Sequence, residues 1–532
     1  MKAVGDLVAE ALAAAGVKRA YIVPGTANWL PNAINQHPDL DLYCVRHESS
    51  AGFMAEADAR LTGVPAVVLA GRSPGAANAA NGVEAARDSS TPMLVLLLDT
   101  DLRDVTREGF QKLDLMGFYR PITKACFAAR AEDSLPDLIS YALRIAVGGR
   151  PGPVAVLIPT DLDGQASDWS PRAIGGMRPA DAPEPERIAE MAARLAQAKA
   201  PVIIAGGGAL HCRDQLVAVA EKFATGVYAA FRRQDVFPND HPLYMGHLGL
   251  GSPPETMRAV READLVLFVG AKLDEWTTQR FTLPLPGVEV MQIDPDRGRV
   301  GALHPSAVGV VADVQVALTA LLGTSTNVPR RDWGPHHDAY LATTVIPPDR
   351  GEAGVDPAQV IKAMRQELPA DTVMTNCAGG YAGFVHRHWI FSHSHSQAAS
   401  TTGTMGYAIP AAIAAKLAMP ERCVVANTGD GGLLMNGHEI EVAVRHKVNI
   451  IIVVYNNHLL SGGGYLDPWD YSEITDVDFA GYARAFGAQG MTVRHASELA
   501  DAFRAARQAG VVTVIDVKTD RAISTASPPK QN

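Results

Sequence analysis

The sequence predicts an α/β protein with three domains, each built around a parallel sheet. Helical patterns alternate with short apolar runs such as 66–69, which is typical of strands buried on both faces. A chain of 532 residues is too long for one core, because a domain takes about 150 residues. Two stretches without a hydrophobic period, 164–186 and 324–355, are predicted to be linkers.

The linkers divide the chain into blocks at 1–163, 187–323 and 356–532. Within each block, apolar runs of four to six residues predict the strands, and they lie at 42–45, 66–69, 93–98, 202–204, 265–269, 423–427 and 450–455. A helical pattern at about 438–446 separates the last two strands and completes a strand-helix-strand unit.

Composition excludes several classes of protein. With 47 basic and 57 acidic residues the net charge is −10, which argues against a nucleic-acid surface. The 5 cysteines are odd in number and scattered, so a disulfide framework or a cysteine zinc site is not indicated, and a reducing cytoplasm fits best. The amino terminus carries Asp6 and Glu10 in an amphipathic pattern unlike a signal peptide, and no segment is predicted to span a membrane.

The most informative stretch contains Asp430, flanked by Gly429, Gly431 and Gly432, and ends at Asn457. Each side chain follows a predicted strand, and the carboxyl ends of parallel strands share one edge of a sheet, so we expect Asp430 and Asn457 to be neighbours. Carboxylate and amide oxygens suit Mg²⁺, and glycines let the backbone approach a diphosphate. An ordinary glycine turn and strand end is the alternative for each motif alone.

This stretch resembles the signature of thiamine-diphosphate enzymes, Gly-Asp-Gly followed some two dozen residues later by Asn-Asn. The resemblance covers nearly the whole chain in the order pyrimidine-binding, middle and diphosphate-binding domain. It implies thiamine diphosphate and Mg²⁺ as cofactors. It also implies Asp430, Asn457 and the backbone carbonyl of Leu459 as metal ligands.

Glu48 is the carboxylate that the resemblance places at the pyrimidine ring. It opens a helical pattern after the strand at 42–45, and the run from Arg46 to Arg60 looks like the activating-glutamate helix of the family. Taken alone, a glutamate in a first helical turn is usually a solvated capping acid. A carboxylic acid hydrogen-bonded to the pyrimidine N1′ favours the imino tautomer that takes the thiazolium C2 proton.

Three other turns of the first block resemble family segments that hold substrate. The turn 23–28 contains Thr26, a catalytic candidate, and Asn28, a substrate candidate. Arg72 begins a glycine-containing turn and is predicted to meet a substrate carboxylate. Phe110 and Gln111 resemble a Phe-Gln segment of acetolactate synthases, so Phe110 is a substrate candidate and Gln111 a catalytic one, with a surface glutamine as the alternative.

The last block offers further cofactor contacts. Thr404 and Met405 match the family segment whose apolar residue wedges between the thiamine rings, although methionine is more often core filler. Gly379 and Gly380 fall where relatives bind the outer phosphate, and a flexible turn is the alternative. The three glycines 462–464 suggest a lid.

Two other patterns have competing explanations. The glycine run 206–208 suggests a dinucleotide turn but lacks the Gly-x-Gly-x-x-Gly spacing. The resemblance leaves FAD possible but not indicated, because some relatives bind it in this domain. Histidines 386, 388, 393 and 395 could suggest zinc, but the run is predicted to be an exposed loop, and His336 and His337 are predicted to be solvated.

The resemblance implies an enzyme acting on a 2-oxo acid by decarboxylation with carboligation, as in acetolactate synthases. The alternatives are a simple decarboxylase resembling benzoylformate decarboxylase, an oxidative relative with FAD, and a non-catalytic binding or regulatory subunit. Because family members place their cofactor between subunits, a homodimer or homotetramer is expected. The substrate's identity lies beyond the sequence.

Overall fold

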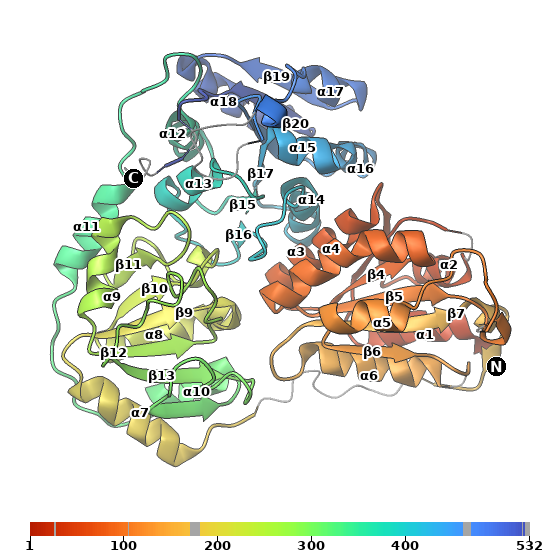
Figure 1. The fold of residues 1–532 in the computed structure, drawn as a ribbon, viewed down its shortest axis with the longest axis horizontal. Helices are drawn as coiled ribbons and strands as arrows, with labels where there is room; N and C mark the ends of the chain where they lie inside the picture. The colour runs from red at the N-terminus through yellow and green to blue at the C-terminus, as the bar shows by residue number, and fades with distance from the viewer. Residues whose placement is uncertain are drawn as a thin grey trace. The chain divides into compact units, whose positions relative to one another are not determined.

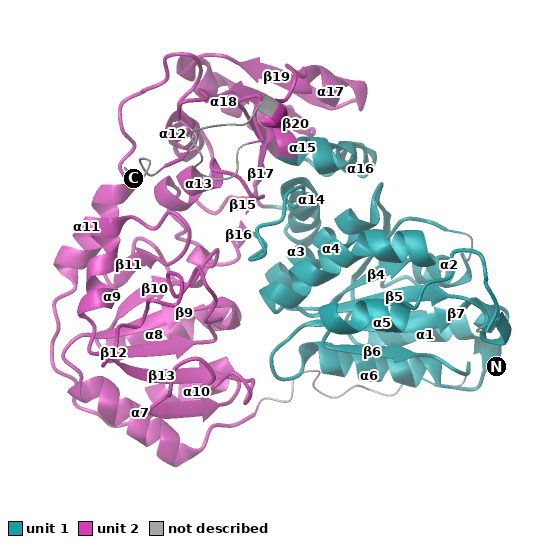
Figure 2. Cartoon of the chain, in the orientation of Figure 1, with its two compact units in different colours: residues 1–179, 398–421, 432–450 teal, residues 180–397, 422–431, 451–532 magenta. Residues whose placement is uncertain are grey.

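A computed structural model describes residues 1–25, 28–104, 106–132, 134–170, 181–460, 470–523 and 525–526. The fold is α/β, as predicted, with three six-stranded sheets (Figure 1). The chain forms two compact units, one of residues 1–179, 398–421 and 432–450, the other of residues 180–397, 422–431 and 451–532 (Figure 2). No helix within the described ranges is long and apolar enough to cross a membrane. The predicted domain boundaries stay a prediction.

The first sheet lies in the first unit, and its strands pair in parallel. Its spatial order is β3 (Asp41–Cys44), β2 (Arg19–Ile22), β4 (Ala66–Ala70), β5 (Met93–Asp99), β7 (Pro153–Pro159) and β6 (Ala125–Ala128). One face is covered by α1 (Val4–Ala14), α2 (Trp29–Gln36) and α6 (Leu135–Val147). The other carries α3 (Glu48–Thr62) and α4 (Ser73–Ser89), with α5 (Leu115–Tyr119) nearby (Figure 1).

Helices α3 and α4 touch backbone to backbone at Gly52 and Gly82. A Cβ on Gly52 would lie 2.6 Å from the Cα of Gly82, and a Cβ on Gly82 would lie 2.5 Å from the Cα of Gly52. No side chain fits between them, so glycine is required at both positions by close approach. This contact sets where α4 passes α3.

The second sheet lies in the second unit and is also parallel. Its order is β11 (Tyr244–His247), β10 (Gly226–Ala229), β9 (Pro201–Ala205), β12 (Leu265–Val269), β13 (Glu289–Asp294) and β14 (Val308–Val311). Helices α7 (Pro185–Gln197), α8 (Arg213–Lys222) and α10 (Val314–Leu322) cover one face, and α9 (Arg258–Glu262) lies on the other.

The glycine run after β9 is explained by packing inside this sheet. A Cβ on Gly206 would lie 2.3 Å from the Cα of Ala271, and one on Gly208 would lie 2.9 Å from the Cα of Gly270. These glycines let the loop after β9 contact the loop after β12 at the strand ends. The run therefore needs no dinucleotide to account for it.

The third sheet also belongs mainly to the second unit. Its order is β16 (Gln397–Ala398), β15 (Val373–Asn376), β17 (Val424–Gly429), β18 (Ile451–Asn456), β20 (Thr513–Lys518) and β19 (Gln489–Val493), and the pairs from β15 to β19 are parallel. Helices α12 (Pro357–Glu367), α13 (Ala382–His388), α17 (Phe479–Ala485) and α18 (Leu499–Ala509) flank it (Figure 1).

Both predicted linkers were partly wrong. The first contains β8 (Ala166–Ser167), which pairs antiparallel with β1 (Lys2–Ala3). The second contains α11 (Gly334–Thr344), on which His337 is buried rather than solvated and its Nδ1 lies 2.8 Å from the Tyr244 carbonyl oxygen. Prolines and charges concealed a helix that packs against β11.

The prediction of an exposed loop for the histidine run was wrong for two of its four members: His393 and His395 lie in a loop, and His393 is exposed. His386 and His388 lie on α13 and are buried, and the Nδ1 of His386 lies 2.7 Å from the Gln234 Oε1. Burial lowers the pKa of His386 well below its usual value and that of His388 to about 4. Across the described ranges, no group of three or more histidine, cysteine or acidic side chains is arranged to hold a metal.

Candidate functional site

Asp430 lies at the carboxyl end of β17, as predicted, and opens α15 (Asp430–Asn436). The helical segment between β17 and β18 thus begins at Asp430, earlier than the predicted 438, and α16 (Ile440–Arg445) follows it. β18 runs beside β17, with Gly429 in register with Tyr455. Asn457 directly follows β18, so parallel pairing places both predicted metal ligands at one sheet edge.

The Asp430 carboxylate is fixed by backbone donors from both sides of this edge. Its Oδ1 accepts from the Gly431 N–H at 2.7 Å, and its Oδ2 accepts from the Leu459 N–H at 3.3 Å. Only 4% of the residue is exposed, and this burial raises the pKa of Asp430, although the N–H donors oppose the shift. A divalent cation would stabilise the buried charge, so the hard oxygen donors here fit Mg²⁺.

The predicted phosphate turn occupies the reversal point of the third sheet. β16 lies on one side of β15 and β17 lies on the other side, so the strand order reverses at β15. Ligands of such sheets bind in the crevice beyond the carboxyl ends of the strands where this reversal occurs. Gly379 and Gly380 follow β15 there. Gly379 has φ +153°, and a Cβ on it would lie 2.3 Å from the Tyr381 ring.

The Tyr381 ring lies against Gly379 and Gly429, and the sequence did not indicate this residue. Its ring stacks on Tyr455 with centroids 4.8 Å apart, and its hydroxyl donates to the Asn427 carbonyl at 3.4 Å. A Cβ on Gly429 would lie 3.2 Å from the same ring. The glycines at 379 and 429 therefore leave room for the tyrosine ring.

Glu48 is the first residue of α3, as predicted. The Nδ2 of Asn78 donates to its Oε2 at 3.0 Å, and a Cβ on Gly75 would lie 2.9 Å from its Oε1. The side chain is only half-buried within one chain. The first two turns of α4 thus contact a carboxylate that remains partly exposed to solvent.

Two turns of the first unit that are predicted to hold substrate, at residues 72–73 and 110–111, are joined by hydrogen bonds. Arg72 donates from Nη1 to the Phe110 carbonyl at 3.4 Å and from Nη2 to the Thr160 hydroxyl at 2.8 Å. The Ser73 N–H donates to the Gln111 carbonyl at 3.1 Å, and Gln111 has φ +56°. The predicted Arg72 guanidinium is therefore engaged in holding the 110–111 turn, whose Phe110 is 74% exposed.

The remaining predicted residues are placed as follows. The Thr404 hydroxyl donates to the Asn81 Oδ1 at 3.1 Å. Asn81 lies on α4, one turn beyond Asn78. Met405 is half-buried. Asn28 directly precedes α2 at its N-cap position, and its side chain makes no capping hydrogen bond. Thr26 and the glycines 462–464 lie outside the described residues.

The structure thus assembles two groups of predicted residues, one in each unit. Gly379, Gly380, Gly429, Asp430, Gly431, Asn457 and Leu459 lie at the crevice of the third sheet in the second unit. Asn28, Glu48, Arg72, Phe110, Gln111, Thr404, Met405 and Gly432 belong to the first.

Glu439 is a functional candidate that sequence reasoning missed. It is fully buried and accepts hydrogen bonds from the backbone N–H groups of Arg46 and His47, the two residues before Glu48. The available signal was its position nine residues after Asp430, but nothing local distinguishes it from a helical surface acid.

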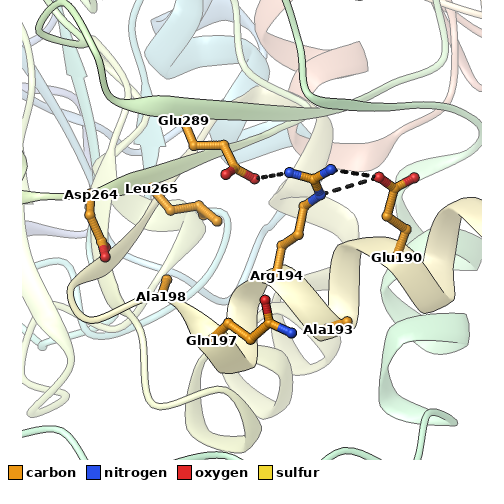
Figure 3. Close-up of a pocket in the computed structure, with 8 residues that line it drawn as sticks. All are labelled: Glu190, Ala193, Arg194, Gln197, Ala198, Asp264, Leu265 and Glu289. Atoms are coloured by element: carbon orange, nitrogen blue, oxygen red, sulfur yellow. Dashed lines mark hydrogen bonds and ion pairs between the residues drawn. The ribbon is translucent and has the colours of Figure 1, made fainter.

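A separate pocket lies at the edge of the second sheet where its strands begin, opposite the edge formed by their carboxyl ends. Figure 3 shows the Arg194 guanidinium between Glu289, at 2.9 Å, and Glu190, at 2.8 Å. Asp264 accepts from the backbone N–H groups of Lys199 and Ala200. Because ligands of parallel sheets bind at the carboxyl edge, and these charges satisfy one another, the predicted chemistry does not belong here.

Comparison with known families agrees with the three-sheet architecture. Residues 2–118 match the thiamine pyrophosphate enzyme N-terminal TPP binding domain, 188–321 the central domain, and 378–517 the C-terminal TPP binding domain.

Among curated relatives, the acetolactate synthase large subunit of Parasynechococcus marenigrum is 30% identical over 508 residues, which covers 90% of this chain and 80% of the relative. The acetolactate synthase isozyme 3 large subunit of Escherichia coli is 29% identical over 521 residues, which covers 93% of this chain and 90% of the relative. The isozyme 1 large subunit of the same organism is 30% identical over 452 residues, covering 84% and 80%.

Proposed function

The chain belongs to the thiamine pyrophosphate enzyme family, and on that premise we propose that it is a Mg²⁺-dependent enzyme that decarboxylates a 2-oxo acid and joins the remaining fragment to a second carbonyl compound. The observation that carries the proposal is the buried Asp430 carboxylate at the reversal point of the third sheet, beside the Gly379 turn. The names of the relatives, acetolactate synthases, support the carboligase outcome.

In this proposal the second unit holds the charged end of the cofactor. Asp430, Asn457 and the Leu459 carbonyl would bind Mg²⁺ together with diphosphate oxygens, and the Gly379–Gly380 turn with Gly429 and Gly431 would let backbone N–H groups reach the phosphates, joined by Gly432 from the first unit. The stacked rings of Tyr381 and Tyr455 would exclude water from the apolar side of this site.

The first unit would supply the acid-base and substrate groups. Thiamine diphosphate supplies, when bound, a carbon nucleophile for 2-oxo acid carbonyls and an electron sink for loss of CO₂. Glu48 would hold a proton at the pyrimidine N1′, and the Asn78 amide orients its carboxyl group. Met405 and Thr404 would contact the cofactor, and Thr26, Asn28 and Gln111 would orient substrate.

The substrate carboxylate is proposed to lie near Arg72 and Phe110. Arg72 donates to Phe110 and Thr160 and lies 3.9 Å from the Asp101 carboxylate, which offsets part of its charge, so the anion would be bound by the guanidinium N–H groups that remain. In this proposal Arg72→Ala raises KM for every accepted 2-oxo acid and also loosens the 110–111 turn.

Other parts of the proposal concern the assembly and compartment. We propose three domains, at 1–163, 187–323 and 356–532. We also propose a homodimer or homotetramer with sites between subunits, which the partial exposure of Glu48 within one chain supports. A reducing, cytoplasmic setting is supported by the five free cysteines.

The deciding experiment assays purified protein, loaded with thiamine diphosphate and Mg²⁺, against pyruvate and benzoylformate. Acetolactate from pyruvate with matching CO₂ release supports the carboligase, and free aldehyde alone supports the simple decarboxylase. A yellow protein containing FAD would favour an oxidative relative. Glu48→Gln should retain cofactor binding and lose turnover by about a hundredfold or more.

A non-catalytic role is tested in the same samples. Thiamine diphosphate at 100 times its dissociation constant should stabilise the protein by about 2.7 kcal/mol. Absence of both thermal shift and turnover would reject the proposed enzyme.

A further inference from the structure

The Glu439 carboxylate is buried against the chain segment that leads into Glu48. Its Oε1 accepts from the Arg46 N–H at 3.0 Å and from the His47 N–H at 3.1 Å, and its Oε2 lies 3.3 Å from the Arg46 nitrogen. The residue is 0% exposed and ends the short 3-10 turn Gly437–Glu439. A buried carboxyl group thus satisfies two backbone donors that belong to a segment 392 residues away.

These two donors lie just before the helix that begins at Glu48. The next capping contact comes from His47, whose Nδ1 accepts from the Ser49 N–H at 3.2 Å and lies 2.7 Å from the Ser49 hydroxyl. Backbone N–H groups at such a helix start have no partner within the helix, so outside groups decide the local path of the chain. Glu439 and His47 together fix the backbone from residue 46 to residue 49.

We propose that Glu439 is a positioning residue for Glu48, an inference that rests on the proposed function of Glu48. By holding the two preceding peptide groups, Glu439 sets the direction in which the Glu48 side chain leaves α3 toward Asn78 and Gly75. Misplacing a reacting group by about 1 Å can cost about a hundredfold in rate, so small backbone shifts here have large effects.

The chain provides a matched control on the same residue. Glu441 forms an ion pair with the Arg46 guanidinium, and its side chain is 36% exposed. Glu439 and Glu441 therefore both contact Arg46, but only Glu439 contacts the backbone. Glu441→Gln removes a carboxylate from the same segment while leaving the donors at residues 46 and 47 satisfied.

The test compares the wild type with Glu439→Gln, Glu439→Ala and Glu441→Gln, all loaded with thiamine diphosphate and Mg²⁺. The readouts are the rate at which the thiamine C2 proton exchanges with deuterium, kcat, KM and the cofactor dissociation constant. We expect Glu439→Ala to slow exchange and kcat together, by about tenfold to a hundredfold, with KM and cofactor affinity within about threefold. Glu439→Gln keeps a side-chain oxygen that can accept from both N–H groups, so it should retain most of the wild-type rate. Glu441→Gln should stay within about twofold of the wild type.

Exchange at the wild-type rate in a folded Glu439→Ala variant would overturn the inference, and so would equal losses in Glu439→Gln and Glu439→Ala. Failure of both variants to fold would assign Glu439 a structural role alone and would overturn it as well. A wild type that binds the cofactor but shows no C2 exchange would instead reject the proposed function.

Discussion

The amide nitrogen of Asn78 lies 3.0 Å from the Glu48 Oε2, so the second turn of α4 donates to the first residue of α3. Gly75, one turn earlier on the same helix, approaches the other carboxylate oxygen. Two residues in successive turns of α4 therefore define both the hydrogen bonding and the space of a single carboxyl group.

Replacing Asn78 by alanine should weaken the orientation of Glu48. One hydrogen bond to a carboxylate is worth about 1.5–3 kcal/mol when buried, and Asn78 is exposed, so we expect a loss of about tenfold in kcat/KM. Steady-state kinetics with pyruvate checks this, and thermal unfolding should show little change. An unchanged kcat/KM would mean that Glu48 is oriented without the amide.

Gly75→Ala should displace the Glu48 carboxyl group directly, because the new methyl carbon would lie 2.9 Å from Oε1. We expect kcat to fall while the dissociation constant of thiamine diphosphate is retained. Gly71→Ala is the control, since a Cβ there meets nothing within 4 Å. Equal kinetics for both variants would contradict the close contact.

Asp430→Asn should abolish stabilisation by thiamine diphosphate and Mg²⁺ without destabilising the protein alone near neutral pH. Burial raises the pKa of Asp430, so the folded state binds its proton more tightly than the unfolded chain. The free energy of unfolding of the metal-free wild type therefore falls as pH rises from 3.8 through the raised pKa.

Urea unfolding of the metal-free proteins across that range measures the difference. The wild type should lose stability relative to Asp430→Asn as pH rises, and the gain from Mg²⁺ and cofactor should grow over the same interval. Parallel pH curves for the two proteins would show that Asp430 titrates normally.

His247 should give the opposite slope. Burial lowers the pKa of this histidine from 6.5 to about 4, so the unfolded chain takes up the proton first as the solution is acidified. Stability from the neutral ring is complete above pH 6.5 and is lost as pH falls toward 4, by on the order of 3 kcal/mol. His247→Phe should lack this acid sensitivity in urea unfolding, and retention of the full slope would assign it to other groups.

The parts of this fold that follow from local pattern were predictable. The strand at 265–269 coincides with β12, and the strands ending before Asp430 and Asn457 are displaced by one or two residues. Apolar β-branched runs specify buried parallel strands directly. Helix α11 was missed because it has a proline, Pro335, in its first turn and a charged residue, Asp338, on its exposed face, next to the prolines and charges of the flanking segments.

The parts that depend on distant contacts were not predictable. Histidine polarity suggested exposure, but His386 is buried by contacts with Gln234, 152 residues away in sequence. The local sequence around Glu439 is typical of an exposed helical acid, and only the structure shows that it accepts from the backbone of residues 46 and 47. Arg72 looked free to meet substrate because its acceptors, Phe110 and Thr160, lie on other loops.

The direct backbone contact of Gly52 with Gly82 limits how this protein can be re-engineered. Libraries aimed at new substrates can vary the exposed position 77 of α4, but any larger residue at 82 would force the two helices apart and misalign everything that α4 carries. Natural divergence meets the same restriction, so changes in specificity should accumulate in the loops while this crossing keeps its geometry.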